Sequence, residues 1–138
     1  MCGFAGVVGK KLNKTVLRKA AKIILHRGPD NTSFLITKEL SLAFNRLSII
    51  DRVKRSNQPF NLNEVKAFVN GEIFNYTELR IKNPDFKPKT NSDIEIIPFL
   101  YINYGIEFLN DLNGMFSIVL IDNKKKINYF IRDRYGEK

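Results

Sequence analysis

A single cysteine stands at position 2 of this 138-residue chain, directly after Met1 and before an apolar run. If Met1 is removed, the Cys2 thiol and a free α-amino group belong to one residue. A thiol attacks as its thiolate, and an α-amine, with an unperturbed pKa of about 7.7 to 8.0, can serve as its base. Cys2 can therefore supply nucleophile and base together. The alternative is a small apolar residue packed at the start of a strand.

The elements that must position Cys2 are mostly strands, in two groups separated by helices. A strand is expected over residues 3–8, followed by a helix over residues 15–25 with Thr15 as its cap. Further strands are expected at residues 33–37, 40–44, 65–69, 115–122 and 127–132. Further helices are expected at residues 77–80 behind a cap at Asn75 or Thr77, at residues 92–104 behind Ser92, and at residues 107–112. This pattern indicates an α+β protein with antiparallel hairpins.

Composition indicates one folded domain without internal disulfides or structural metal ions. Hydrophobic residues make up 43% of the chain, enough to build a core at this length. One Cys and one His cannot form an internal disulfide or a four-ligand zinc site. No leader and no apolar stretch of about 18 residues is found, so neither a signal peptide nor a membrane span is expected. These features favour a soluble cytoplasmic protein without a metal.

The formal net charge of +9 raises the question of nucleic-acid binding. Such binding needs cations gathered on one face, whereas the cations here are scattered along the chain. The only basic run, Lys124-Lys125-Lys126, lies between two expected strands and is predicted to be a solvated hairpin tip. We therefore expect neither a nucleic acid nor a membrane as partner.

Seven short motifs follow one another along the chain: Met1-Cys2-Gly3-Phe4-Ala5-Gly6, His26-Arg27-Gly28-Pro29-Asp30, Asn45-Arg46-Leu47-Ser48-Ile49-Ile50-Asp51, Asn70-Gly71-Glu72-Ile73-Phe74-Asn75, Ser92-Asp93-Ile94-Glu95, Leu112-Asn113-Gly114-Met115-Phe116 and Arg132-Asp133-Arg134-Tyr135-Gly136. Together they resemble the glutaminase domain of class II glutamine amidotransferases, in the N-terminal nucleophile (Ntn) hydrolase superfamily. The likeness is closest to glutamine-hydrolysing asparagine synthetases and covers essentially the whole chain. It implies a four-layer α/β/β/α sandwich of two mainly antiparallel sheets between helices.

The resemblance implies hydrolysis of the glutamine side-chain amide to glutamate and ammonia, through a thioester at Cys2. Acyl transfer also needs donors for the oxyanion, and Asn70-Gly71 offers a side-chain amide beside an unhindered backbone N–H. An Asn-Gly pair is otherwise an ordinary hairpin turn. Because Cys2 and Glu72 are also present in the chain, we favour the oxyanion role for Asn70-Gly71.

The remaining site residues are assigned by the resemblance. Arg46 is expected to bind the glutamine carboxylate, and Glu72 and Asp93 are expected to face its ammonium group. Taken alone, Arg46 would be a surface salt bridge and Asp93 a helix-terminal charge. The further candidates for the substrate pocket are Leu47, Ile49, Ile50 and Arg27. His26 invites a Cys-His pair, but because the family uses the terminal amine as base, we expect His26 to be a structural loop residue.

The resemblance also implies what lies outside this chain: further strands of the sandwich, and a synthetase domain that uses ATP and Mg²⁺ to activate aspartate. No cofactor is expected in the chain itself. Phe74 stands where the family pattern has Tyr, which removes only a hydroxyl group. We expect a truncated glutaminase domain that supplies ammonia for asparagine synthesis. The alternatives are an amidotransferase serving another acceptor, such as a sugar, and a noncatalytic interaction module. Homodimer formation is left open.

Overall fold

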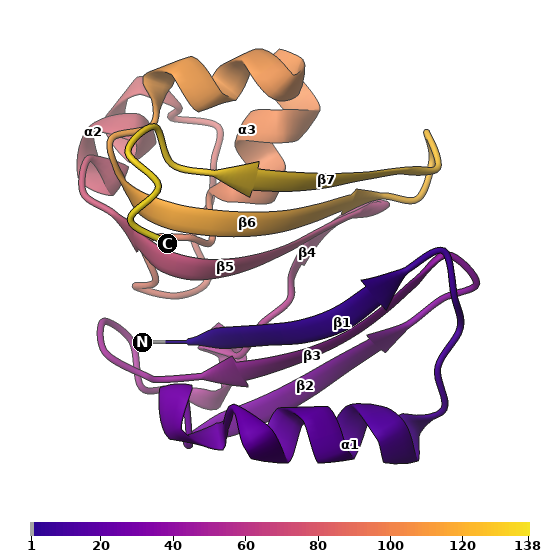
Figure 1. Cartoon of the computed structure of the whole chain (residues 1–138). Helices are drawn as coiled ribbons and strands as arrows, with labels where there is room; N and C mark the ends of the chain where they lie inside the picture. Colours follow the sequence, from indigo (N-terminus) through magenta and orange to yellow (C-terminus); the bar gives the residue numbers. More distant parts are fainter. Residues whose placement is uncertain (1) are drawn as a thin grey trace. The chain divides into compact units, whose positions relative to one another are not determined.

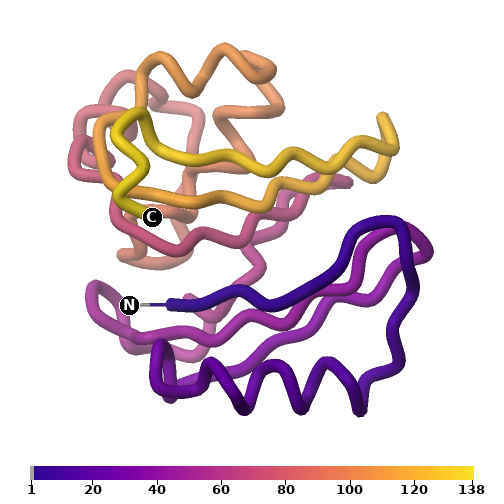
Figure 2. The backbone as a smooth tube through the Cα atoms, in the orientation of Figure 1, coloured from indigo at the N-terminus to yellow at the C-terminus, as the bar shows by residue number. Residues whose placement is uncertain are grey.

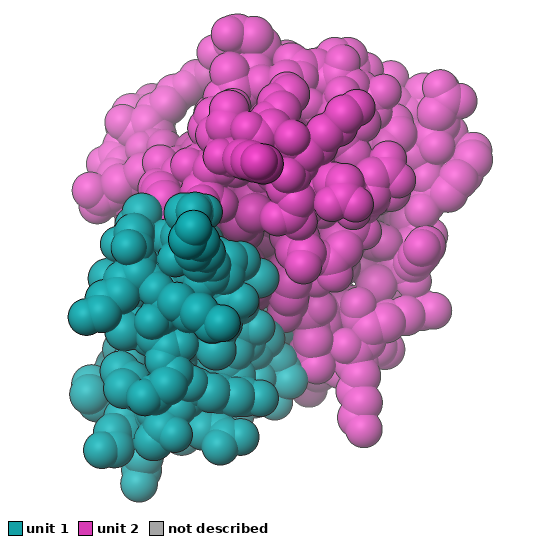
Figure 3. Space-filling view, turned by 90° about the vertical axis from the view of Figure 1, so that its right-hand side faces the viewer, with its two compact units in different colours: residues 1–49 teal, residues 50–138 magenta. Residues whose placement is uncertain are grey.

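The computed structural model describes residues 2–138. Composition predicts a single domain, and within the chain the contacts form two compact units, residues 1–49 and 50–138, coloured teal and magenta in Figure 3. Each unit has its own antiparallel sheet and its own helices (Figure 1). The predicted α+β class with two antiparallel sheets is confirmed, and the stacking of these sheets into four layers stays a prediction.

The first unit is a three-stranded sheet with a helix on one face (Figures 1 and 2). Its elements are β1 (Gly3–Val8), α1 (Lys14–Ile23), the 3-10 turn η1 (Leu25–Arg27), β2 (Asn31–Ile36) and β3 (Leu40–Arg46). The strand order is β1-β3-β2, and all seven residues of β3 are buried. Leu17 and Ala21 of α1 pack against Ala43 of β3. The helix is capped by Asn13, whose Oδ1 accepts a bond from the Val16 N–H at 2.9 Å, so the predicted Thr15 cap is wrong.

The second unit is a four-stranded antiparallel sheet in the order β4-β5-β6-β7. Its elements are η2 (Lys54–Ser56), β4 (Phe60–Leu62), β5 (Val65–Ile73), α2 (Tyr76–Lys82), α3 (Ile97–Tyr104), η3 (Gly105–Asp111), β6 (Gly114–Asp122) and β7 (Ile127–Arg132). The core of this unit joins buried side chains of α3 and η3 to those of β5 and β6, among them Ile97, Leu100, Phe108, Val69, Ile118 and Leu120. No helix within residues 2–138 is long and apolar enough to cross a membrane.

The predicted helix over residues 92–104 is wrong in its first half, because α3 begins at Ile97. Asp93 and Glu95, which the predicted bounds would put in the first turn of the helix, bind backbone elsewhere. Asp93 Oδ2 accepts a bond from the Ile73 N–H at 2.8 Å, and the Glu95 carboxylate accepts bonds from the N–H groups of Lys89 and Thr90. Residues 93–96 therefore form turns, and the helix starts where Pro98 stands in its first turn.

The strand predicted to end at residue 69 continues through Ile73, so Asn70-Gly71 lies inside β5. Gly71 pairs with Phe116 of β6 and has a φ of +148°, a value that favours glycine. A Cβ on Gly71 would collide with the Met115 carbonyl oxygen. The turn signal of Asn-Gly is therefore overridden, because glycine here permits a close approach between two strands rather than a reversal of the chain.

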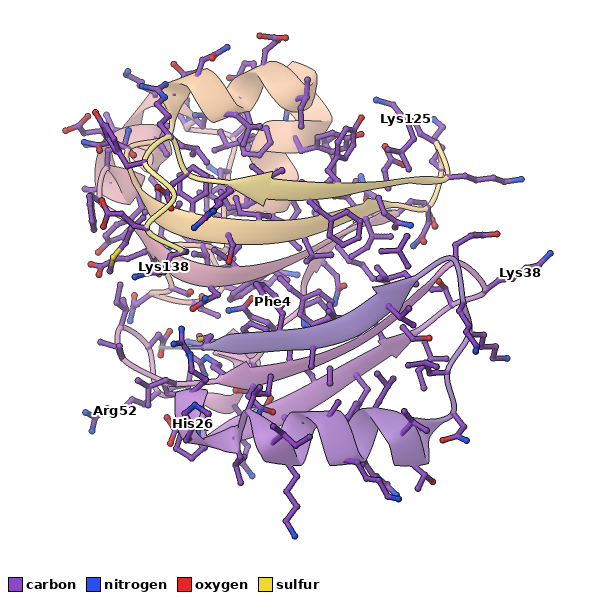
Figure 4. All side chains as sticks on the ribbon, in the orientation of Figure 1. Phe4, His26, Lys38, Arg52, Lys125 and Lys138 are labelled. Carbon is purple, nitrogen blue, oxygen red and sulfur yellow. The ribbon has the colours of Figure 1, made fainter. Side chains whose placement is uncertain are left out.

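The hairpin predicted near the C-terminal end of the chain is confirmed. Strands β6 and β7 are joined by residues 123–126, and the three lysines at its tip are exposed, with Lys125 labelled in Figure 4. The strand β4 was not predicted, because three residues are too few to show an alternating pattern.

Beyond β7 the chain is held by the buried carboxylate of Asp133. This carboxylate accepts bonds at 3.0 to 3.2 Å from the backbone N–H groups of Phe116, Tyr135, Glu137 and Lys138. Burial raises the pKa of Asp133, but these donors lower it by more, so its pKa lies below the ordinary value. The ionised carboxylate therefore ties the segment after β7 to β6.

We predict that Asp133→Asn lowers the melting temperature at neutral pH, because the amide is a weaker acceptor for these donors. A depressed carboxyl pKa adds stability that is present above the unfolded pKa, about 3.9, and is lost as the pH falls through the lower folded pKa. The difference in melting temperature between wild type and variant should therefore shrink in acid. Asp85→Asn, at an exposed aspartate, is the control. A difference that stays constant with pH would contradict the assignment.

Candidate active site

Cys2 lies just before β1 and is half buried. Its Sγ accepts a bond from the Leu47 N–H at 3.4 Å and faces the Leu47 carbonyl oxygen at 3.8 Å. The register explains this contact, because Gly3 pairs with Asn45 and the chain leaving β3 must then pass the thiol. The structure therefore brings Cys2 and Leu47 together.

The loop over residues 28–30 packs against and hydrogen-bonds to residues 45–48, the segment that contacts the Cys2 thiol. A Cβ on Gly28 would come within 2.5 Å of the Asn45 carbonyl oxygen, so only glycine fits. The Asp30 N–H donates to the Arg46 carbonyl oxygen at 3.0 Å, and the Asp30 carboxylate accepts a bond from the Ser48 N–H at 2.7 Å. This loop therefore fixes the backbone that carries Arg46 and Leu47.

Arg27 contacts the main chain of Cys2 rather than its sulfur. The Arg27 Nε–H donates to the Cys2 carbonyl oxygen at 3.4 Å, and its side chain is exposed. The neighbouring His26 is exposed on η1 (Figure 4). Arg27 is thus placed to orient the start of β1, and His26 lies outside this set of contacts among residues 2–138.

Burial raises the pKa of the Cys2 thiol. The bond from the Leu47 N–H and the positive charge of Arg46 lower the same pKa and offset part of this effect. Arg46 ends β3 and has only 6% of its surface exposed. A raised pKa keeps the resting side chain as a thiol at neutral pH, so a base must take its proton when it reacts.

The other predicted residues belong to the second unit. Asn70 is 7% exposed and its Oδ1 is buried without a hydrogen-bond partner among residues 2–138. Gly71 and Glu72 follow it in β5 and are half buried. A buried amide beside a strand N–H is a donor pair of the kind that stabilises an oxyanion.

Asp93 is 4% exposed and is placed beside the same strand by its bond to the Ile73 N–H. Burial raises the pKa of Asp93, the Ile73 N–H lowers it, and the charge of Glu72 raises it. The structure thus places Glu72 near enough for its negative charge to act on the Asp93 carboxyl.

The predicted residues are divided between the two units. The first unit carries Cys2, Arg27, Arg46, Leu47 and Ile49; the second carries Ile50, Asn70, Gly71, Glu72 and Asp93. The side chains of Ile49 and Ile50 are exposed. Within residues 2–138 no cluster of His, Cys, Asp and Glu could hold a metal ion.

Sequence reasoning missed two buried residues that support these positions. Asn45 is fully buried; its Nδ2 donates to the Ala21 carbonyl oxygen at 2.7 Å and its Oδ1 accepts a bond from Thr32. Gln58 is 4% exposed and binds the backbone of Val69, directly before Asn70. Asn45 follows an apolar run and Gln58 precedes Pro59, and neither local pattern reveals the partner of the side chain.

We predict that alkylation of Cys2 by iodoacetamide accelerates with pH through a midpoint above that of a free cysteine, because burial disfavours the thiolate. Arg46→Met should move the midpoint further upward, since it removes a positive charge near the sulfur. Cys2 is the only cysteine, so Cys2→Ser must take up no label. A midpoint at or below the free-cysteine value would contradict this prediction.

Comparison with known proteins shows the family of the chain. The family model described as "Glutamine amidotransferase domain" matches residues 1–138. The chain is 41% identical over 147 residues to asparagine synthetase (glutamine-hydrolyzing) 2 of Bacillus subtilis, covering 100% of this chain and 19% of that protein. It is 40% identical over 144 residues to asparagine synthetase B (glutamine-hydrolyzing) of Escherichia coli, covering 99% and 26%. The chain spans about a fifth to a quarter of the length of these relatives. The predicted resemblance is confirmed: the chain belongs to the glutamine amidotransferase domain family.

Proposed function

We propose that this chain hydrolyses the side-chain amide of glutamine to glutamate and ammonia, as the glutaminase part of an asparagine synthetase. The observation that carries the proposal is the Cys2 thiol, held against the Leu47 backbone near the buried Arg46. The relatives named above are called glutamine-hydrolyzing asparagine synthetases, which favours aspartate-linked chemistry over a sugar as ammonia acceptor. A noncatalytic module would not need a thiol held in this way.

The reaction proceeds by acyl transfer to sulfur. The Cys2 Sγ attacks the amide carbon, a C–S bond forms, and the carbonyl oxygen becomes an oxyanion that accepts bonds from Asn70 and the Gly71 N–H. The α-amine of Cys2, freed by removal of Met1, takes the thiol proton and passes it to the nitrogen as the C–N bond breaks. Ammonia leaves, and water then hydrolyses the thioester to glutamate. This use of an N-terminal residue is that of an Ntn hydrolase.

The amino-acid end of glutamine supplies two charges for recognition. Arg46 binds the α-carboxylate with its planar guanidinium fork, and Asp93 and Glu72 bind the α-ammonium. Because burial and Glu72 raise the pKa of Asp93, the substrate cation favours the ionised form that the free site disfavours. Arg27, Leu47, Ile49 and Ile50 complete the pocket.

The ammonia serves ATP-dependent synthesis of asparagine from aspartate in the synthetase region of a full-length enzyme. ATP and Mg²⁺ act there, and no cofactor is expected in this chain itself. The free thiol suits a reducing cytoplasm.

Cys2→Ala is predicted to lower glutamate release by roughly 10³-fold or more, because no other group on the chain replaces the nucleophile. His26→Ala should retain activity, which distinguishes the amine base from a Cys-His pair. Intact mass identifies the protein from which Met1 is removed, and only this form should be active. Equal glutamate release by wild type and Cys2→Ala would eliminate the proposed nucleophile.

Arg46→Lys is predicted to raise the KM for glutamine by about 10-fold to 100-fold, since a bidentate bond to a carboxylate is lost. The matched control is Arg52→Lys, at an exposed arginine labelled in Figure 4, which should leave KM unchanged. Initial-rate kinetics with glutamate detection measure both. An unchanged KM for Arg46→Lys contradicts the assigned role.

A further inference from the structure

One edge of β5 is completed by side chains instead of a strand. In an antiparallel strand the N–H and C=O groups of alternate residues point to the same edge. The Phe74 N–H donates to the Asn113 carbonyl oxygen on the β6 side. By alternation, the N–H and C=O groups of Val69, Gly71 and Ile73 therefore point to the opposite edge, away from β6. On the edge away from β6, the pairing with β4 reaches only from Val65 to Ala67.

At Val69 the partner is the side-chain amide of Gln58. The Gln58 Nε2 donates to the Val69 carbonyl oxygen at 3.0 Å, and the Val69 N–H donates to the Gln58 Oε1 at 2.5 Å. Since Phe60 pairs with Ala67, residue 58 stands where an extended β4 would meet Val69. The amide thus reproduces the two bonds that a strand residue would make.

At Ile73 the partner is Asp93, whose Oδ2 accepts the Ile73 N–H at 2.8 Å. Both Gln58 and Asp93 are 4% exposed, so these bonds are shielded from water. Gly71 lies between the two bonded positions, and the alternation directs its N–H to the same edge, where no strand of residues 2–138 pairs with it. The neighbouring Asn70 carries a buried Oδ1 without a partner among residues 2–138.

We propose that Gln58 is a positioning residue for the oxyanion hole: with Asp93 it replaces a neighbouring strand on both sides of Gly71 and so holds the Gly71 N–H as an open donor. This inference rests on the proposed function. Gly71 adopts a φ of +148°, and a glycine can adopt many other backbone conformations as well. The direction of its N–H therefore depends on how the flanking residues are held. An oxyanion donor acts only when it is aimed before the charge develops.

The test compares Gln58→Met, which keeps the length of the side chain but loses both bonds, with Asn83→Leu. Asn83 is a matched control because it is also a buried amide with both ends bonded, to the Leu79 carbonyl oxygen and the Tyr104 hydroxyl, neither of which belongs to β5. We expect Gln58→Met to lower kcat for glutamate release by about 10-fold to 100-fold with KM changed less than about threefold. Asn83→Leu should change neither constant, although both variants lower the melting temperature.

Amide hydrogen exchange followed by NMR gives a readout that does not depend on activity. In the wild type the Val69 and Ile73 amides should be protected and the Gly71 amide should exchange faster than both. Gln58→Met should remove protection at Val69, whereas Asn83→Leu should not. If Gln58→Met does not fold, Gln58→Glu, which keeps the acceptor for the Val69 N–H and loses the donor, is expected to show a smaller loss of kcat.

The outcomes separate the two proposals. A Gly71 amide as protected as Val69 in the wild type overturns the open-donor inference, and so does an unchanged kcat in Gln58→Met when Val69 has lost its protection. A wild-type protein, with Met1 removed, that releases no glutamate overturns the proposed function. The exchange pattern then still decides whether Gln58 and Asp93 hold Gly71 open.

Discussion

The close approach of β5 and β6 at Gly71 is the constraint on which the second unit depends. A side chain on Gly71 would collide with the Met115 carbonyl oxygen, and one on Gly114 would collide with that of Glu72. Two glycines therefore let the strands come together where Asn70, Gly71 and Glu72 need a fixed backbone. Asp133 bonds the Phe116 N–H on the far strand, so the segment after β7 supports the same crossing. A shift in any of these contacts moves the proposed oxyanion donors.

In the first unit two opposing effects act on the Cys2 thiol, which is half buried and yet must react in the proposed mechanism. Burial raises the pKa of the Cys2 thiol, and the Leu47 N–H and the positive charge of Arg46 lower it in part. The pKa stays above its ordinary value, so the thiol depends on a base, which the freed α-amine of Cys2 supplies in the proposed mechanism. Gly28 and Asp30 hold the backbone of residues 46–48 against the sulfur. The reactivity of Cys2 thus depends on a loop more than on its own strand.

Local patterns in the sequence predicted the elements whose signals are local. The apolar stripe of α1, the hairpin of β6 and β7, and the α+β class follow from periodicity and turn residues. The helix start at Ile97 did not, because Asp93 and Glu95 bind backbone outside the helix. Asn-Gly predicted the end of a strand, yet Gly71 continues β5 because β6 lies too close for any other residue. The bond of Asp93 to Ile73 and the approach of Met115 to Gly71 both involve partners distant in sequence.

By itself the sequence determined the family and the chemical types of the candidate site: a thiol at Cys2, a guanidinium at Arg46, an amide at Asn70 and a carboxylate at Asp93. Those types follow from residue identity and order alone. Only the tertiary structure decided how each group is held, since Leu47 meets Cys2 across 45 positions of the chain and Asp93 meets Ile73 across 20. The role of Gln58 belongs wholly to this second kind. The role of a buried side-chain amide depends on the backbone that it binds, and no local sequence pattern predicts that partner.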